Sequence, residues 1–159
     1  MLFLLRVIKL YSIFCSNNIN NNPIKIRNPF STRPWQHVLD PLFGYLLLAS
    51  NLYDNPQKFS TEYNFGPSPN DTINVKELVE YSINYWGRGS YIVENKLKYP
   101  ESSLLKLDIS KAAKDLNWRP LFGSKKSIDI TLEWYRIYDQ NKDQSIKVIL
   151  SLIRKILKK

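Results

Sequence analysis

The clearest pattern in the sequence is an apolar stretch from Val38 to Tyr53. Hydrophobic residues recur there at helical spacing and also fill the other sides of the helix: Leu39, Leu42, Phe43, Leu46, Ala49 and Tyr53, with Leu47, Leu48 and Leu52 between them. A helix that is apolar on all sides is normally buried on all sides, so we expect this one to be largely enclosed. Gly44 within it permits another segment to approach the backbone closely.

A second helix is expected from Val75 to Trp86, because its two ends carry clear signals. Asn74 is a suitable N-cap with Glu77 three residues later, and Gly87 follows the last apolar position. Two further helices are indicated nearer the carboxyl end. One runs from a capping Ser110 to Leu116, ahead of Trp118 and Pro120, and the other runs from Ser127 to Tyr138.

Three short segments are typical of strands. Ile24 and Ile26 alternate with cationic residues, which predicts a strand with one buried face. Residues 62–65 and 90–93 are the other two predicted strands. The segment 62–65 leads into the loop GPSPND, and loops that follow strands often carry ligand-binding backbone.

The two ends of the chain differ from its middle. Residues 1–22 form an apolar run broken by Arg6 and Lys9 and then an Asn-rich tract, and the run is shorter than the roughly 18 residues of a membrane span. Residues 143–159 predict a basic amphipathic helix whose apolar face is Ile146, Ile149, Leu150, Ile153 and Leu157. Such a helix either packs on the domain or lies on an anionic membrane surface. We therefore divide the chain into an amino-terminal segment (1–22), one domain (23–142) and a tail (143–159).

Composition narrows the classes of partner. Of the formal net charge of +9, residues 143–159 contribute +4 and residues 1–22 contribute +2, so the middle of the chain keeps only +3. A surface that neutralises many phosphates of a nucleic acid is not expected from so small an excess. Cys15 is the single cysteine, which excludes an intrachain disulfide and favours a reducing, cytoplasmic location.

The string RNPFSTRPWQHVLDPLFGYLLLA, from Arg27 to Ala49, contains the strongest candidate binding residue. Arg33 stands in a segment stiffened by proline, and a planar guanidinium suits bidentate bonding to a phosphate. A surface salt bridge is the alternative role for Arg33. Trp35 either belongs to the core or stacks on a base, while Glu101 either accepts hydrogen bonds from sugar hydroxyls or is simply solvated.

These residues also carry a resemblance. The string resembles the RNP-x-x-x-RPWQHV-x-x-P-x-x-GYL-x-LA signature of the CDP-glucose 4,6-dehydratases. EYNFGP at 62–67 is similar to the strand and loop that contact the nucleotide in that family. LKLDISKAAKDLNWRP followed by TLEWYRIY is similar to the carboxy-terminal pattern of extended short-chain dehydrogenases/reductases. Together the three segments cover roughly residues 23–139.

The resemblance implies an α/β fold, namely the carboxy-terminal part of a Rossmann-type extended short-chain dehydrogenase/reductase, with an incomplete sheet and a small mixed substrate-binding lobe. It also implies CDP-glucose as ligand, with Arg33 and Asn64 as contacts and Trp35 and Glu101 as weaker candidates. The family is an NAD-dependent lyase group that makes deoxysugar precursors of surface polysaccharide such as lipopolysaccharide. Where the family usually has His-Glu-Ala, this chain has Pro100, Glu101 and Ser102, which puts that contact in doubt.

The cofactor and catalytic motifs of the family are missing from this sequence. It contains no G-x-x-G-x-x-G, and no Tyr-x-x-x-Lys pair stands in the family's context. We therefore assign no catalytic residue, expect no NAD to bind this chain alone, and expect a truncated, substrate-binding part that is inactive by itself. The alternatives are a binding module that complements a separate NAD-binding chain, with a homodimer also conceivable, or a basic protein at the membrane surface.

Overall fold

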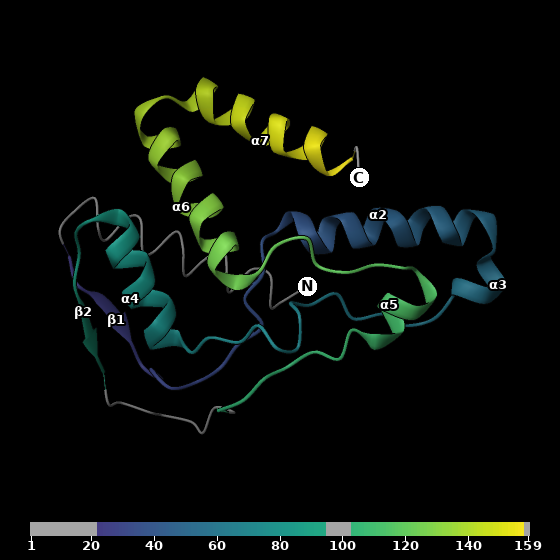
Figure 1. The fold of residues 1–159 in the computed structure, drawn as a ribbon, viewed down its shortest axis with the longest axis horizontal. Coiled ribbons are helices and arrows are strands. Elements are labelled where there is room, and N and C mark those ends of the chain that lie inside the picture. Colours follow the sequence, from purple (N-terminus) through teal and green to yellow (C-terminus); the bar gives the residue numbers. More distant parts are fainter. Residues whose placement is uncertain (1–21, 95–102, 158–159) are drawn as a thin grey trace.

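The computed structural model describes residues 22–94 and 103–157, and these are mostly helical with one small parallel sheet. The elements in chain order are β1 (Ile24–Ile26), α2 (Leu39–Asp54), α3 (Pro56–Phe59), α4 (Val75–Trp86), β2 (Tyr91–Val93), α5 (Ser110–Asp115), α6 (Ser124–Gln140) and α7 (Lys142–Ile156). Figure 1 shows the sheet and α4 at one end, with α2, α3 and α5 at the other. Helices α6 and α7 form a hairpin at the carboxyl end of the chain.

Two of the three predicted strands are confirmed. Strands β1 and β2 pair in parallel, with Ile24 opposite Tyr91 and Ile26 opposite Val93. Both isoleucines are buried, whereas Lys25 between them points outward and pairs with Glu94 at 3.1 Å. The alternation in the sequence therefore follows burial, as a half-buried strand requires.

The strand predicted at 62–65 is wrong, because those residues have no regular secondary structure. A β-propensity pattern specifies an extended backbone but does not supply a partner strand. In place of a strand ladder, the side-chain amide of Asn64 donates to the backbone carbonyl of Asp108 at 3.2 Å.

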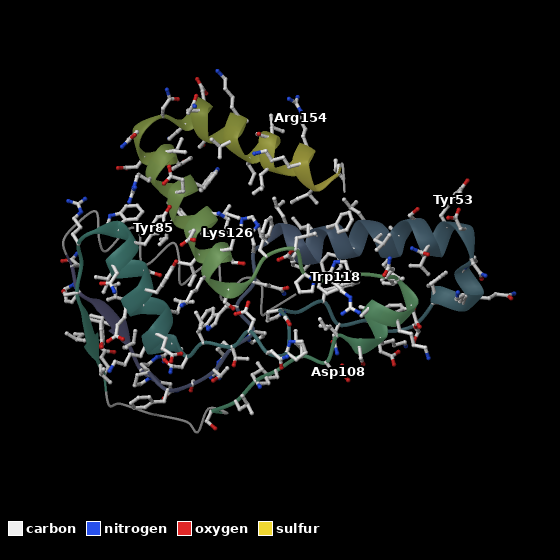
Figure 2. All side chains as sticks on the ribbon, in the orientation of Figure 1. Tyr53, Tyr85, Asp108, Trp118, Lys126 and Arg154 are labelled. Carbon is white, nitrogen blue, oxygen red and sulfur yellow. The ribbon has the colours of Figure 1, made fainter. Side chains whose placement is uncertain are left out.

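The chain buries two separate hydrophobic cores. The first lies between the sheet, α4 and α6, and its buried members are Ile24, Ile26, Trp35, Leu78, Val79, Ile128 and Leu132. The second gathers α2, α3 and α5 around Trp118, and its buried members are Phe59, Phe65, Ile109, Ala112, Leu116 and Trp118. Figure 2 shows Trp118 within this second group of elements. The segments that connect the elements run from one core to the other.

The ends of α4 are as predicted. The Asn74 side chain accepts from the backbone N–H of Glu77, the Glu77 carboxylate accepts from the backbone N–H of Asn74, and Gly87 adopts the left-handed conformation with φ of 81°. The start of α5 differs in one respect: Ser110 is its first residue, and the carboxylate of Asp108 accepts from the Ser110 N–H at 2.9 Å. The local cap is therefore an aspartate two residues earlier than the helix start.

Helix α2 is present where it was predicted but is not enclosed. Its inner side packs on the second core, and Gly44 lies so close to Phe65 that a Cβ at that position would overlap the phenyl ring. Its outer side is open to solvent, with Leu46 65% and Tyr53 90% exposed. The sequence predicts burial on all sides, and the described part of the chain covers only one of them.

Helix α7 packs against α6, and the indole N–H of Trp134 donates to the carbonyl of Ser145 at 3.2 Å. The predicted apolar face is buried only in part: Ile149 and Ile153 are half-buried, whereas Ile146, Leu150 and Leu157 are exposed. Ser145 and Ile156 are the buried residues of α7. The indole contact at Ser145 fixes which side of α7 meets α6, and an amphipathic pattern alone does not specify that side. No helix among residues 22–94 and 103–157 is long and apolar enough to cross a bilayer.

Candidate functional site

The candidate site is built around Arg33, whose segment is held between two distant parts of the chain. The backbone N–H of Thr32 donates to the carbonyl of Ser103 at 2.8 Å, and the N–H of Leu105 donates back to Thr32 at 3.2 Å. On the other side, the N–H of Val75 donates to the carbonyl of Ser31 at 3.1 Å. The Arg33 side chain therefore extends from a backbone segment that hydrogen bonds hold on both sides.

A small, shallow cleft lies beside Arg33. Its lining comes from three separate parts of the chain: Arg33 and Pro34; Pro67, Ser68, Pro69 and Thr72; and Leu105, Lys106 and Leu107. Two of these side chains are cationic and none is acidic, so the cleft favours an anion. The Arg33 guanidinium is half-buried and donates through Nη1 to the carbonyl of Thr32 at 2.9 Å.

The loop on the far side of the cleft, residues 66–72, is held at both ends by side-chain hydrogen bonds rather than by a helix or strand. The Gln36 side-chain amide donates to the carbonyl of Phe65 at 2.9 Å, just before the loop. The Trp35 indole donates to the carbonyl of Ile73 at 3.0 Å, just after it. Asp71 in the loop accepts from the backbone N–H of Ser124 and so supplies the cap that α6 lacks locally. The loop is thus tied to the Arg33 segment and to α6.

The residues predicted from the sequence lie in different places. Arg33 lines the cleft. Asn64 is exposed and lies two residues before the buried Gly66, but it is not among the residues that line the cleft. Trp35 is 6% exposed and belongs to the first core, where its indole holds the loop. Glu101 lies outside the described residues.

His37 and Asp40 form a buried acid and base near the start of α2. His37 Nδ1 accepts from the N–H of Leu39 at 3.3 Å, its ring lies edge-on to Phe122 at 5.5 Å, and burial lowers its pKa to about 4. Burial likewise raises the pKa of Asp40 to about 6, against the lowering effect of the backbone N–H groups of Leu121 and Phe122. Because of this low pKa, the His37 imidazole is neutral near neutral pH.

Sequence reasoning missed Lys106 and Asp40. Lys106 is exposed between Leu105 and Leu107, and this alternation was the available signal for an extended segment with one cationic side. Asp40 gave no comparable signal, because an aspartate in the first turn of a helix is normally a solvent-exposed N-terminal charge. Here the backbone after Trp118 returns to α2, and the N–H of Leu121 donates to Asp40 Oδ1 at 2.8 Å.

The glycines of this chain do not fit a dinucleotide site. Such a site needs a glycine turn that joins a strand to the start of a helix. Gly44 lies inside α2, Gly66 lies in the cleft loop, and Gly87 follows the last residue of α4. Gly123 directly precedes α6 and follows an irregular segment, not a strand. Gly89, the fifth, stands in the connection between α4 and β2. Within the described ranges there is also no group of three metal-ligating side chains.

No protein-family model matches the chain. The CDP-glucose 4,6-dehydratase of Salmonella typhimurium is 38% identical over 128 residues, which are 80% of this chain and 36% of that enzyme. The chain therefore spans little more than a third of the length of this curated relative.

Solved structures show the fold. The dTDP-glucose 4,6-dehydratase of Bacillus anthracis in complex with NAD is similar with a TM-score of 0.63 and 17% identity, over 87% of this chain and 41% of that one. A UDP-glucose 4-epimerase of Stenotrophomonas maltophila, with bound NAD and a formylated UDP-arabinopyranose, has a TM-score of 0.68 and 15% identity, over 84% and 40%. The predicted fold class is confirmed: this is a partial extended short-chain dehydrogenase/reductase fold, mostly helical with a small parallel sheet.

Proposed function

We propose that this chain, which is homologous to part of CDP-glucose 4,6-dehydratase, binds the diphosphate of a CDP-sugar in the cleft between Arg33, Lys106 and residues 67–72. In this role it is the substrate-binding part of a nucleotide-sugar dehydratase-like protein of the cytoplasm. The observation that carries the proposal is the meeting of three distant segments in one cleft that has two cations and no acid.

The chemistry of the lining supports a diphosphate. A guanidinium bonds phosphate oxygens in a bidentate manner, and an ammonium group adds a second positive charge. Ser68 and Thr72 provide hydroxyl donors on the opposite wall. The prolines at 34, 67 and 69 limit the backbone freedom that ligand binding would otherwise have to remove.

The relatives support the choice of ligand class. The Salmonella relative is named for CDP-glucose, and the solved relatives are named for dTDP- and UDP-sugars. They therefore share a nucleoside diphosphate joined to a sugar and differ in the base. We propose CDP-glucose on the strength of the 38% identity to the Salmonella enzyme.

Dehydration would require NAD from elsewhere, because the glycines of this chain do not fit its pyrophosphate. Several solved relatives contain NAD in chains of which this chain matches about two fifths. We propose that this chain positions the nucleotide sugar and takes part in turnover only together with an NAD-binding partner chain. In that role it would contribute to deoxysugar synthesis for surface polysaccharide.

Titration calorimetry with CDP-glucose tests the proposal directly. We expect saturable binding that Arg33→Ala weakens about 10- to 100-fold, which is the effect of losing a charge-assisted phosphate contact. Arg154→Ala is the matched control, because it removes the same charge from the outer surface of α7, where Arg154 points away from the rest of the chain (Figure 2). Arg33→Lys keeps the charge without the planar fork and should fall between the two.

Two results would contradict the proposal. One is the absence of binding heat with CDP-glucose, CDP and UDP-glucose for a sample whose circular dichroism shows the expected helices. The other is an equal loss of affinity from Arg33→Ala and Arg154→Ala, since a general effect of net charge would then explain both.

A further inference from the structure

Helix α2 carries a stripe of exposed apolar side chains, one of which, Tyr45, also lies edge-on to Phe65 of the second core at 5.3 Å. We call it the outer stripe: Leu42, Tyr45, Leu46, Ala49 and Tyr53. These positions lie on one side of the 16-residue helix α2, so from Leu42 to Tyr53 they form one continuous face about 17 Å long. Figure 2 shows Tyr53 at the far end of this helix, directed away from the rest of the chain.

The opposite side of α2 is equally apolar. Phe43, Leu47, Leu48 and Leu52 pack against the second core. The helix is therefore hydrophobic all round, which is the composition of a helix that is covered on all sides in its working state. Exposed apolar faces of this extent mark interaction surfaces in soluble proteins.

The absence of charged residues along the stripe indicates what kind of surface would cover it. No charged residue occurs from Pro41 to Tyr53, and only Asp40 and Asp54 stand at the ends. Helix α7 is different, because its exposed Ile146, Leu150 and Leu157 alternate with Lys147, Arg154 and Lys155. A neutral stripe fits an apolar protein face, whereas an anionic lipid surface or a nucleic acid would require cations beside it.

We infer that the outer stripe of α2 is the docking face for an NAD-binding chain, the part of the dehydratase fold that this chain does not match. The solved relatives hold the same partial fold within chains about two and a half times as long as the matched part, since the match covers 39–41% of them. The other three fifths of each chain are the candidate for the surface that covers the outer stripe. This inference rests on the proposed relation to the dehydratases but does not depend on sugar binding.

Co-expression with the unmatched part of the Salmonella enzyme, carrying an affinity tag, tests the inference. We expect this chain to co-purify in a 1:1 ratio, and Leu46→Glu to reduce the retained fraction at least tenfold. Leu150→Glu is the matched control: it also places a carboxylate on an exposed leucine, but on α7, and should change retention less than twofold. Arg33→Ala should leave retention unchanged, which separates docking from nucleotide-sugar binding.

The positive control is the same tagged part co-expressed with the Salmonella enzyme's own matched part. Retention of that control without retention of this chain would overturn the inference. So would equal losses from Leu46→Glu and Leu150→Glu, or a dimer of this chain alone that Leu46→Glu converts to monomer, because a second copy would then occupy the stripe.

A single-chain chimera covers the case in which the separated part does not fold. This chain replaces the matched part of the Salmonella enzyme within one polypeptide, and thermal unfolding is followed by calorimetry. Docked parts should unfold in one transition that Leu46→Glu, but not Leu150→Glu, separates into two. Two independent transitions in the unsubstituted chimera would refute docking through this face.

Discussion

Burial of His37 and Asp40 predicts two opposite pH dependences of stability that the unsubstituted chain conceals. The pKa of Asp40 is raised from 3.8 to about 6, so its contribution to stability is full below pH 3.8 and is lost as the pH rises through 6. The pKa of His37 is lowered from 6.5 to about 4, so its contribution is full above pH 6.5 and is lost as the pH falls through 4. The two groups therefore act in the same window with opposite signs.

The magnitudes follow from the pKa differences. At 1.36 kcal/mol for each pKa unit, each group changes the free energy of unfolding by about 3 kcal/mol across the window. Both side chains are buried, with Asp40 0% and His37 5% exposed, so solvent screens neither effect strongly. Asp40→Asn keeps an oxygen to accept from Leu121 and cannot ionise, and His37→Gln keeps polarity without titrating.

Urea denaturation followed by tryptophan fluorescence between pH 3.5 and 7.5 measures both effects. Relative to the unsubstituted chain, Asp40→Asn should gain about 3 kcal/mol as the pH rises, and His37→Gln should lose about as much. The difference from the unsubstituted chain removes the contributions of other titrating groups. The reasoning would be refuted if the free energy of unfolding of both variants changed with pH in the same way as that of the unsubstituted chain. Neither pKa would then differ between the folded and unfolded states.

Two further substitutions test packing and the cleft. Gly44→Ala should lower the free energy of unfolding by about 1–2 kcal/mol in the same urea assay, because overlap with Phe65 outweighs the gain in helix propensity; a more stable variant would contradict the close approach described above. Asp71→Ala should cost about 1 kcal/mol by removing the cap of α6, and it should also weaken CDP-glucose binding in calorimetry although Asp71 does not line the cleft. Unchanged affinity in that variant would show that the loop holds its shape without this tie.

Local signals in the sequence were sufficient where a few neighbouring residues determine the structure. Asn74, Glu77 and Gly87 set both ends of α4 without help from the rest of the chain. The alternation at Ile24 and Ile26 likewise predicted β1 and its buried face. Such features depend on contacts within one or two turns, so the pattern and the structure agree.

Features that depend on distant contacts were not predictable in the same way. The sequence identified α2 as apolar all round but did not indicate which side the rest of the chain would cover. For the candidate site, residue type and proline neighbours pointed to Arg33, which lines the cleft. Lys106 was not found, because only the bridge between Thr32 and Leu104 brings its segment beside Arg33.

The cleft lies on the segments that connect the two cores, so a ligand bound there would affect how the two cores unfold. Residues 33–34 lead from β1 towards α2, residues 67–72 lead back towards α4, and residues 105–107 lead into α5. A ligand that contacts all three segments would link the parts of the chain that form the two cores (Figure 1). A bound ligand would then make the two cores unfold together, so ligand binding could be followed through the thermal unfolding of the chain itself.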